Sequence, residues 1–167
     1  GIEVGALPDH VSISPNGKYA IVANEGEPTN YCLTSGKLPE TTDPLGSVSI
    51  INLSSKTPTA QTIDFKSFAV RKNAITYAGG RIFGPNATVE QDIEPEYASF
   101  SADSAYAYVT LQENNSIATV EVATGTIVNI LGLGVKNHNV YNNGLDSSDR
   151  DNVINIEKRN IQGMYLP

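Results

Sequence analysis

The sequence has 167 residues, enough for one ordinary domain and too few for two. Its 11 Lys and Arg against 18 Asp and Glu give a formal charge of −7, which disfavours nucleic acid and anionic lipid headgroups as partners. Charged residues make up only 17% of the chain, beside 14 Gly and 9 Pro, so short strands and turns are favoured over long solvated helices. No apolar run approaches the roughly 20 residues of a membrane-spanning helix, so no membrane insertion of this chain is expected.

An internal repeat organises the chain. Residues 8–14 align with 95–101 and residues 19–22 with 106–109, both at an offset of 87. Residues 47–53 align with 116–122 at an offset of 69, so the first copy carries 18 extra residues (87 minus 69) between its second and third strands. That insertion lies within Gly26–Gly46, whose Pro, Thr, Gly and Ser content is typical of a loop.

Each copy has the pattern of four short strands joined by turns. The first copy places its first turn at Ser14–Gly17, and the expected strands after that turn, in both copies, are Lys18–Ala23, Ser47–Leu53, Thr59–Phe65, Glu96–Ser101, Ala105–Leu111, Ser116–Val122 and Thr126–Leu131. A recurring four-stranded antiparallel unit is typical of a β-propeller blade, because one such sheet cannot bury both faces alone. A sandwich of eight strands fits the strand count too, but the matched order of the two copies favours blades.

The sequence therefore predicts an all-β fold of propeller blades with a short helix and long loops. Blade-like repeats are expected at about 5–65 and 92–132, a helix and loop connection at 66–91, and a loop-rich excursion at 133–167. The helix is placed over Lys66–Tyr77 and ends at Gly79-Gly80. All 167 residues are assigned to part of a single propeller domain. Because propellers use about four to eight blades, we expect the remainder of the propeller to come from a longer protein or another chain.

Three acidic clusters are candidate metal ligands. Glu25 and Glu27 follow the second strand of the first copy, and Asp92, Glu94 and Glu96 alternate at the start of the second copy. A third cluster, Asp146, Asp149 and Asp151, lies in a turn rich in Ser and Asn. Carboxylate oxygens are the ligands that calcium prefers, so calcium is the expected cofactor if these clusters converge on one propeller face. The alternative is that these acids are solvated strand ends and Asx turns.

Several other features have weaker patterns. His138 is a lone loop histidine, and Cys32 has neither a second cysteine nor a base partner in the sequence, so neither predicts a reactive site. Three Asn-x-Ser/Thr sequons begin at Asn52, Asn86 and Asn114, where glycosylation depends on a eukaryotic secretory route.

Several longer phrases of the sequence are distinctive: residues 5–9, 14–18, 22–28, 46–51, 81–85, 92–97, 108–115 and 144–151. Together these phrases resemble a known family, the choice-of-anchor I proteins, which are bacterial surface and secreted propellers similar to mesenchyme-specific cell surface glycoproteins of animals. The resemblance covers residues 5–167. It implies an extracellular or cell-surface protein that continues beyond residue 167, and it transfers no catalytic residues.

Two function classes follow. In the first, the chain is an extracellular or cell-surface propeller module that binds calcium and contacts surface glycans, mineral or other surface proteins. In the second, it is a calcium-dependent phosphoester hydrolase, alkaline-phosphatase-like or phytase-like, with Arg150 and Lys136 as candidate phosphate-binding residues. Because an acidic rim repels phosphate, the second class needs more than one bound cation to reverse the local charge.

Overall fold

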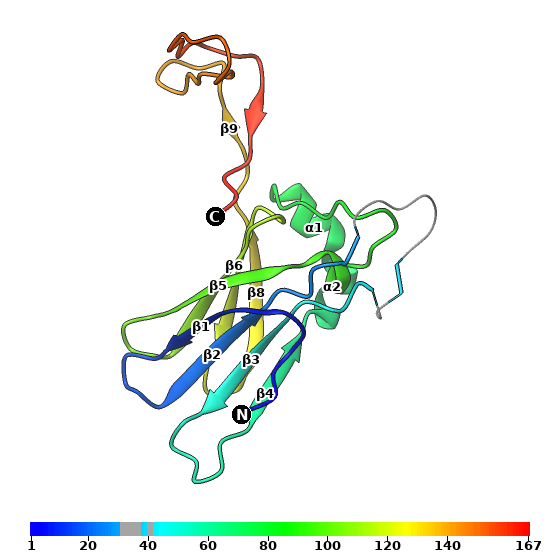
Figure 1. Cartoon of the computed structure of the whole chain (residues 1–167), viewed down its shortest axis with the longest axis vertical. Helices are drawn as coiled ribbons and strands as arrows, with labels where there is room; N and C mark the ends of the chain where they lie inside the picture. Colours follow the sequence, from blue (N-terminus) through cyan, green and yellow to red (C-terminus); the bar gives the residue numbers. More distant parts are fainter. Residues whose placement is uncertain (31–37, 40–41) are drawn as a thin grey trace.

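Two four-stranded antiparallel sheets make up the body of the protein (Figure 1). The computed structural model describes residues 1–30, 38–39 and 42–167. In each sheet the strands follow one another in chain order, so every neighbouring pair is joined by a turn or a loop. The first sheet contains β1 (Pro8–Ile13), β2 (Tyr19–Asn24), β3 (Ser47–Asn52) and β4 (Ala60–Asp64). The second contains β5 (Pro95–Phe100), β6 (Tyr106–Leu111), β7 (Ser116–Glu121) and β8 (Thr126–Gly132).

The first turn is built identically in the two sheets. In the first, the hydroxyl of Ser14 accepts a hydrogen bond from the backbone N–H of Tyr19 at 3.0 Å. In the second, the equivalent Ser101 accepts from Tyr106 at 2.9 Å. The repeat is therefore present at the level of individual hydrogen bonds, which supports the alignment at an offset of 87.

The core lies between the two sheets. Alternate residues of β2 and β3, among them the fully buried Ile21 and Val48, face alternate residues of β6 and β7, among them the fully buried Ala107 and Val109. β6 and β7 alternate between buried and more exposed positions, as expected of strands with one packed face, whereas β2 and β3 are buried on both faces. A smaller cluster of Ala20, Val22 and Ile51 lies on the opposite face of the first sheet, where Val4 and Ala60 pack against it.

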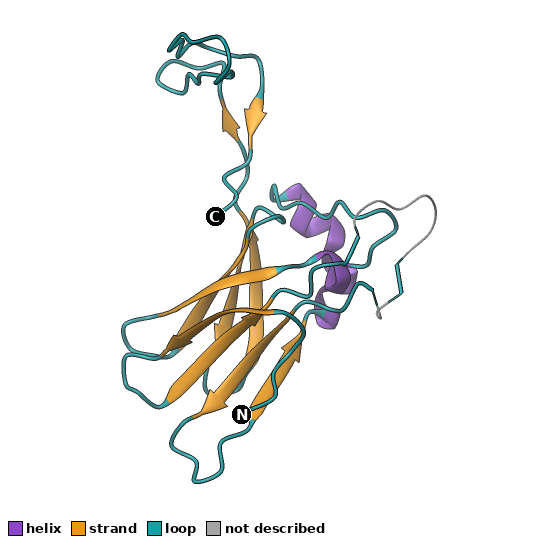
Figure 2. Ribbon diagram, in the orientation of Figure 1, coloured by secondary structure: helices purple, strands orange, loops and turns teal. Residues whose placement is uncertain are grey.

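A helical connection joins the sheets and covers one end of them (Figure 2). It consists of the 3₁₀-helix η1 (Lys66–Arg71), α1 (Lys72–Tyr77) and α2 (Val89–Asp92). The chain leaves α1 through Gly79, which has a φ of +89° and whose α-carbon approaches the backbone of Gly134 too closely for any side chain. The predicted helix over Lys66–Tyr77 is thus present, with its first half wound as a 3₁₀-helix.

The C-terminal excursion, residues 133–167, projects away from the sheets (Figure 1). Its two arms pair as a short antiparallel ribbon of β9 (Lys136–Asn137) and β10 (Gln162–Gly163). The fully buried Asn115 fastens its base: Nδ2 donates to the carbonyl of Gly134 at 2.7 Å, and Oδ1 accepts from the backbone N–H of Tyr165 at 2.8 Å and of Leu166 at 3.3 Å. One side chain therefore holds both ends of the excursion against the second sheet.

The predicted fold class is confirmed: the chain is mostly β, with two blade-like four-stranded sheets, short helices and long loops. Cys32 and much of the insertion within Gly26–Gly46 lie outside the described residues. Among the described residues, no helix is long and apolar enough to cross a membrane.

Candidate functional site

Two equivalent β-bulges shape one end of the sheet pair. The register between β1 and β2 shifts between Pro8 and His10, and the register between β5 and β6 shifts between Pro95 and Tyr97. The extra residues are Asp9 and Glu96, which occupy the same position of the repeat. A bulge redirects the side chain that it carries, so each sheet has an acidic residue displaced from its regular strand position.

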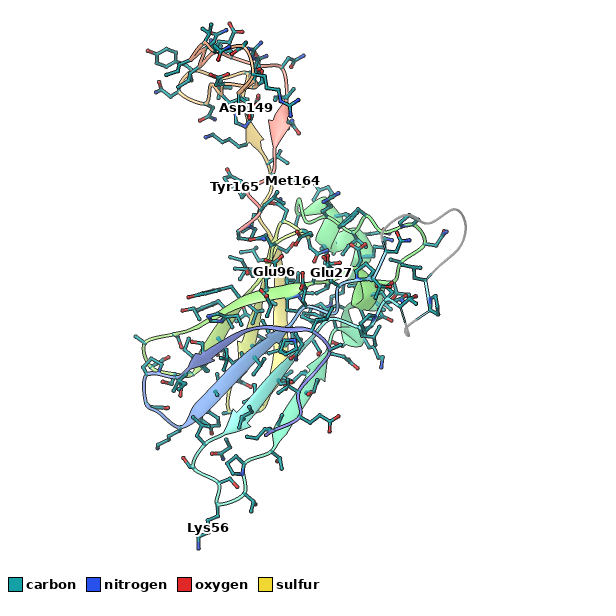
Figure 3. All side chains as sticks on the ribbon, viewed as in Figure 1. Glu27, Lys56, Glu96, Asp149, Met164 and Tyr165 are labelled. Atoms are coloured by element: carbon teal, nitrogen blue, oxygen red, sulfur yellow. The ribbon has the colours of Figure 1, made fainter. Side chains whose placement is uncertain are left out.

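These bulges bring acidic residues of both sheets together. Glu25 follows β2, and Glu113 follows β6 at the corresponding end of the second sheet. The charges of Asp9, Glu25 and Glu113 act on Glu96, and the charge of Glu27 acts on Glu25. We call this group, Asp9, Glu25, Glu27, Glu96 and Glu113, the acidic seam. Figure 3 shows Glu96 and Glu27 at the same end of the sheets.

Glu96 is the most perturbed group of the acidic seam. Burial, the carboxyl of Glu113 and the charges of Glu25 and Asp9 raise the pKa of Glu96 to about 8. Its Oε2 accepts a hydrogen bond from Nε2 of Gln112 at 2.7 Å. When both carboxyl groups are ionised, Oε2 of Glu113 is a buried acceptor without a donor among the described residues. A proton on Glu96 supplies that donor, so the hydrogen bond with Glu113 is one cause of the raised pKa of Glu96.

Glu25 has the same kind of environment. Burial and the charges of Glu27, Asp9 and Glu113 raise the pKa of Glu25 above its ordinary value. The charged neighbours that act on Glu25 and Glu96 are all acids, so the seam repels anions and attracts cations. Calcium needs six to eight oxygen ligands in flexible geometry and accepts water among them, so the donor chemistry of the seam fits this ion.

The acids are not arranged as a finished metal cage. Among the described residues, no group of three or more His, Cys, Asp or Glu side chains is placed to hold a metal ion as it stands. Glu27 and Asp9 are exposed. A cation at the seam would therefore be held by carboxylates that turn toward it and by water.

The sequence predicts that Asp92, Glu94 and Glu96 alternate along an extended segment, and for Asp92 this prediction is wrong. Asp92 is the last residue of α2, not part of an extended strand. It is buried, and its carboxylate accepts hydrogen bonds from the backbone N–H groups of Phe83, at 2.9 Å, and Gly84, and from Nδ2 of Asn114 at 3.1 Å. Burial is the largest cause of its raised pKa. Asp92 therefore anchors the 83–84 loop.

Glu94, the second acid of this segment, lines a cavity. It is buried, and together with Asp43 and Asp92 it lines a small cavity of about 40 Å³ beside Phe83. Its backbone N–H donates to Oδ1 of Asn114 at 3.1 Å. Glu96 is the acid of the 92–96 segment whose pKa is raised by the charges of Glu113, Glu25 and Asp9.

The third acidic cluster lies far from the other two. Figure 3 shows Asp149 at the tip of the excursion, well away from Glu96. The carboxylate of Asp146 accepts backbone hydrogen bonds from Ser148 at 3.2 Å and Asn155 at 3.0 Å, which lower its pKa. Asp151 accepts from the N–H of Val153 at 3.1 Å. The expected convergence of all three clusters on one face is therefore wrong, and the loop has the internal bonds of Asx turns.

The candidate phosphate-binding residues belong to the excursion too. Arg150 lies 3.8 Å from Asp149, with both side chains more than 90% exposed, and Lys136 lies in β9. Neither cation is part of the acidic seam. No observation therefore favours the phosphoester hydrolase, which needs cations and metal ligands around one phosphate.

Asp9 and Glu113 are the residues that the sequence-based metal set leaves out. The repeat itself indicates Asp9, because it aligns with Glu96 at the offset of 87.

The structure distinguishes the three glycosylation sequons. The side-chain amide of Asn114 is fully buried and donates to the carbonyls of Asp92 and Arg81, so it is closed to a glycan in the folded chain. Asn52 and Asn86 are exposed.

Comparison with known proteins gives a family. No curated protein matches the chain. Among solved structures, hydrazine synthase of Kuenenia stuttgartiensis is similar with 14% sequence identity and a TM-score of 0.42. The match covers 72% of this chain and 28% of the hydrazine synthase chain. The family model of the choice-of-anchor I domain matches residues 1–167. The chain belongs to the choice-of-anchor I domain family.

Proposed function

We propose that this chain is part of an extracellular or cell-surface β-propeller that binds calcium at the acidic seam and uses it to stiffen the contact between its two sheets. The observation that carries the proposal is the environment of Glu96, a half-buried acid whose charged neighbours are acids from both sheets. Family membership supports the surface placement, because choice-of-anchor proteins are typically surface-associated.

A calcium ion at the seam would do two things. It would replace the proton on Glu96, because a divalent cation favours the ionised form of this carboxyl group. It would also attract Glu25 and Glu27 from the first sheet toward Glu96 from the second, so the two sheets would be linked by oxygen ligands as well as by the apolar core. The surface thus stabilised would contact glycans, mineral or other surface proteins.

Thermal unfolding of the whole chain, with added calcium chloride and with a chelator, tests the proposal. At a calcium concentration of 100 times Kd, binding to the folded state contributes about 2.7 kcal/mol. For a chain of this size, that corresponds to a rise in Tm of about 5–10 °C. The double variant E25Q/E96Q should lose most of this rise, because it removes one ligand from each sheet.

A matched triple variant, D146N/D149N/D151N, removes the acids of the excursion and should keep the calcium-dependent rise. If the triple variant loses the rise and E25Q/E96Q keeps it, the calcium site belongs to the excursion and not to the acidic seam. A wild-type Tm that is the same with calcium and with chelator would overturn calcium binding altogether.

A further inference from the structure

Two Asn-Gly pairs occur in the sequence, Asn16-Gly17 and Asn143-Gly144. In such a pair the backbone nitrogen of the glycine can attack the side-chain carbonyl carbon of the asparagine, because glycine has no side chain to obstruct the approach. The attack requires that this nitrogen loses its proton and is free to move toward the side chain. The structure gives the two pairs different environments for this reaction.

The first pair is held in an unreactive arrangement. The backbone N–H of Gly17 donates to the carbonyl of Ser14 at 2.8 Å. The side-chain oxygen of Asn16 accepts from the hydroxyl of Ser14 at 2.8 Å and from the backbone N–H of Lys18 at 2.9 Å. An attack by Gly17 would break these hydrogen bonds, so the turn protects Asn16 although Asn16 and Gly17 are both exposed.

The second pair, in the excursion, has no such protection at its nitrogen. The backbone N–H of Gly144 has no acceptor among the described residues. Gly144 also lines an open hollow of about 360 Å³, so water has access to this residue. In the part of the chain that the structure describes, the side chain of Asn143 makes a single hydrogen bond, from Nδ2 to the carbonyl of Asn137 at 3.1 Å. The second pair is therefore the more reactive one, although it is less exposed than the first.

His138 is placed to activate this pair. Its Nδ1 lies 2.7 Å from the backbone carbonyl oxygen of Asn143. A carbonyl oxygen can only accept a hydrogen bond, so Nδ1 carries a proton and donates it. Negative charge develops on this oxygen when the nitrogen of Gly144 loses its proton, and a donor aimed at the oxygen stabilises that charge. The contact with His138 therefore makes the nitrogen of Gly144 easier to ionise.

The other arm of the excursion holds His138 in this position. The backbone N–H of His138 donates to the carbonyl of Ile161 at 3.1 Å, and its carbonyl accepts from the N–H of Arg159 at 3.0 Å. Gly163 lies against the ring, because a Cβ at this position would be only 2.7 Å from Nε2 of His138. The opposite arm thus fixes the backbone of His138 and leaves just enough room for its ring.

We propose that Asn143 is a site of spontaneous deamidation, activated by His138. The deprotonated nitrogen of Gly144 bonds to Cγ of Asn143, and Nδ2 takes up a proton from solvent and leaves as ammonia. Water then opens the resulting succinimide. Attack of water at Cγ gives aspartate, whereas attack at the backbone carbonyl carbon of residue 143 gives isoaspartate. Because His138 donates to the oxygen of that backbone carbonyl, it favours the isoaspartate product.

Isoaspartate would change the tip of the excursion in two ways. Its free carboxylate contains the oxygen that His138 already faces, so their hydrogen bond becomes a charge-assisted one. The main chain also gains one methylene group shortly before Leu145, whose N–H and carbonyl are paired with Glu157. The modification therefore adds a negative charge and displaces the pairing that closes the 145–157 loop.

Peptide mapping of the folded chain after ageing at neutral pH tests the proposal. Trypsin places the two pairs in separate peptides, 1–18 and 137–150. Fragmentation in the mass spectrometer locates each modified residue and distinguishes isoaspartate from aspartate. We expect Asn143 to deamidate about three- to tenfold faster than Asn16 in the folded chain, and at a similar rate in urea, where the protecting and activating hydrogen bonds are lost. A rate at Asn143 that is equal to or below that at Asn16 in the folded chain would overturn the proposal.

Variants of His138 test the activation itself. H138A should slow deamidation of Asn143 about three- to tenfold and lower its isoaspartate fraction to the value found in urea, while Asn16 keeps its rate. H138N supplies an amide donor near the position of Nδ1 and should restore both quantities. G163A keeps the imidazole but forces it out of place, so it should resemble H138A.

Two outcomes with these variants would overturn the role of His138. One is an H138A chain with the rate and the isoaspartate fraction of the wild type. The other is an H138N chain that behaves like H138A, because the loss would then come from a disturbed excursion and not from a missing donor. All measurements are made without calcium, so they are independent of the acidic seam.

Discussion

His10 and Tyr97 occupy the same position in the two sheets, and their rings contact each other with centroids 3.9 Å apart. Nδ1 of His10 also accepts a hydrogen bond from the backbone N–H of Ala98 at 3.3 Å, so β1 and β5 are joined by a side chain at the level of their bulges. The residues just before them, Asp9 and Glu96, are the acids that the bulges displace. The aromatic contact therefore fixes the separation of the two acidic bulges.

A double-mutant cycle measures this contact. H10A and Y97A should each destabilise the chain, and the double variant should cost less than their sum by about 0.5–1.5 kcal/mol, the usual coupling of a ring pair. Urea unfolding gives the four free energies. H10A combined with Y106A is the control, because Tyr106 lies at the end of β6 away from Tyr97, and the coupling should be near zero. Zero coupling between His10 and Tyr97 would show that their proximity has no energetic consequence.

Glu96 should make stability depend on pH in a defined window. In the unfolded chain it ionises near its ordinary value of 4.5, and in the folded chain its pKa is about 8. Between these values the folded state holds a proton that the unfolded state has released. The contribution of Glu96 to the free energy of unfolding is therefore largest below about pH 4.5, falls as the pH rises, and is lost above about pH 8.

The variant E96Q removes this titration, so its urea midpoint should change less than that of the wild type between pH 5 and pH 8. E3Q is the control, since Glu3 is exposed near the N-terminus and its replacement should leave the wild-type profile intact. Calcium affinity should rise over the same window, because binding at the acidic seam must release the proton. Parallel pH profiles for wild type and E96Q would contradict the role of Glu96.

Asp92 should contribute to stability through its backbone contacts. D92N replaces a carboxylate oxygen by an amide group that faces the N–H donors of Phe83 and Gly84, so at least one buried donor loses its acceptor. We expect a loss of about 1–3 kcal/mol in the free energy of unfolding. D64N, which removes an exposed ion pair with Lys66, should change it by less than about 1 kcal/mol. Equal effects of the two substitutions would disprove the anchoring role of Asp92.

Asn115 should control the attachment of the excursion. N115G keeps the left-handed backbone conformation of this residue, whose φ is +49°, but removes the amide that holds Gly134, Tyr165 and Leu166. Limited proteolysis should then cut the excursion faster, while the sheets keep their circular dichroism. The control is N142G, at an exposed residue with a φ of +69°. If both variants are cut at the wild-type rate, the excursion is held by other contacts.

The sequence predicts the sheets well because their determinants are local and repeated. Ser14 and Ser101, with the strands that follow them, can be aligned without any structure, and the alternation of β6 shows which residues are buried. The bulges at Asp9 and Glu96 have no such signal, because each follows the first residue of its strand and no earlier alternation is present for the extra residue to interrupt. The metal ligands predicted from the sequence therefore do not include Asp9, although the repeat aligns this residue with Glu96.

The remaining differences have one physical cause: carboxylates near each other in sequence can have different partners in space. Asp92 and Glu96 are four residues apart, but α2 ends at Asp92 and the two side chains have different partners. Asp92 accepts hydrogen bonds from backbone amides, whereas Glu96 belongs to the acidic seam. Asp146 is likewise engaged by Ser148 and Asn155 at the tip of the excursion. Acidic spacing alone could not distinguish these roles, because it does not report which N–H groups the fold leaves without acceptors.

The base of the excursion has a consequence for how this fold can vary. The side-chain amide of Asn115 binds Gly134, where the chain leaves the second sheet, and Tyr165 and Leu166, where it returns. The excursion is therefore attached to the second sheet at the same two points whatever residues lie between them. Insertions, deletions or whole replacement modules placed between Gly134 and Tyr165 should leave the two four-stranded sheets unaltered. The side chain of Asn115 thus makes this position a natural exchange site for new surface content.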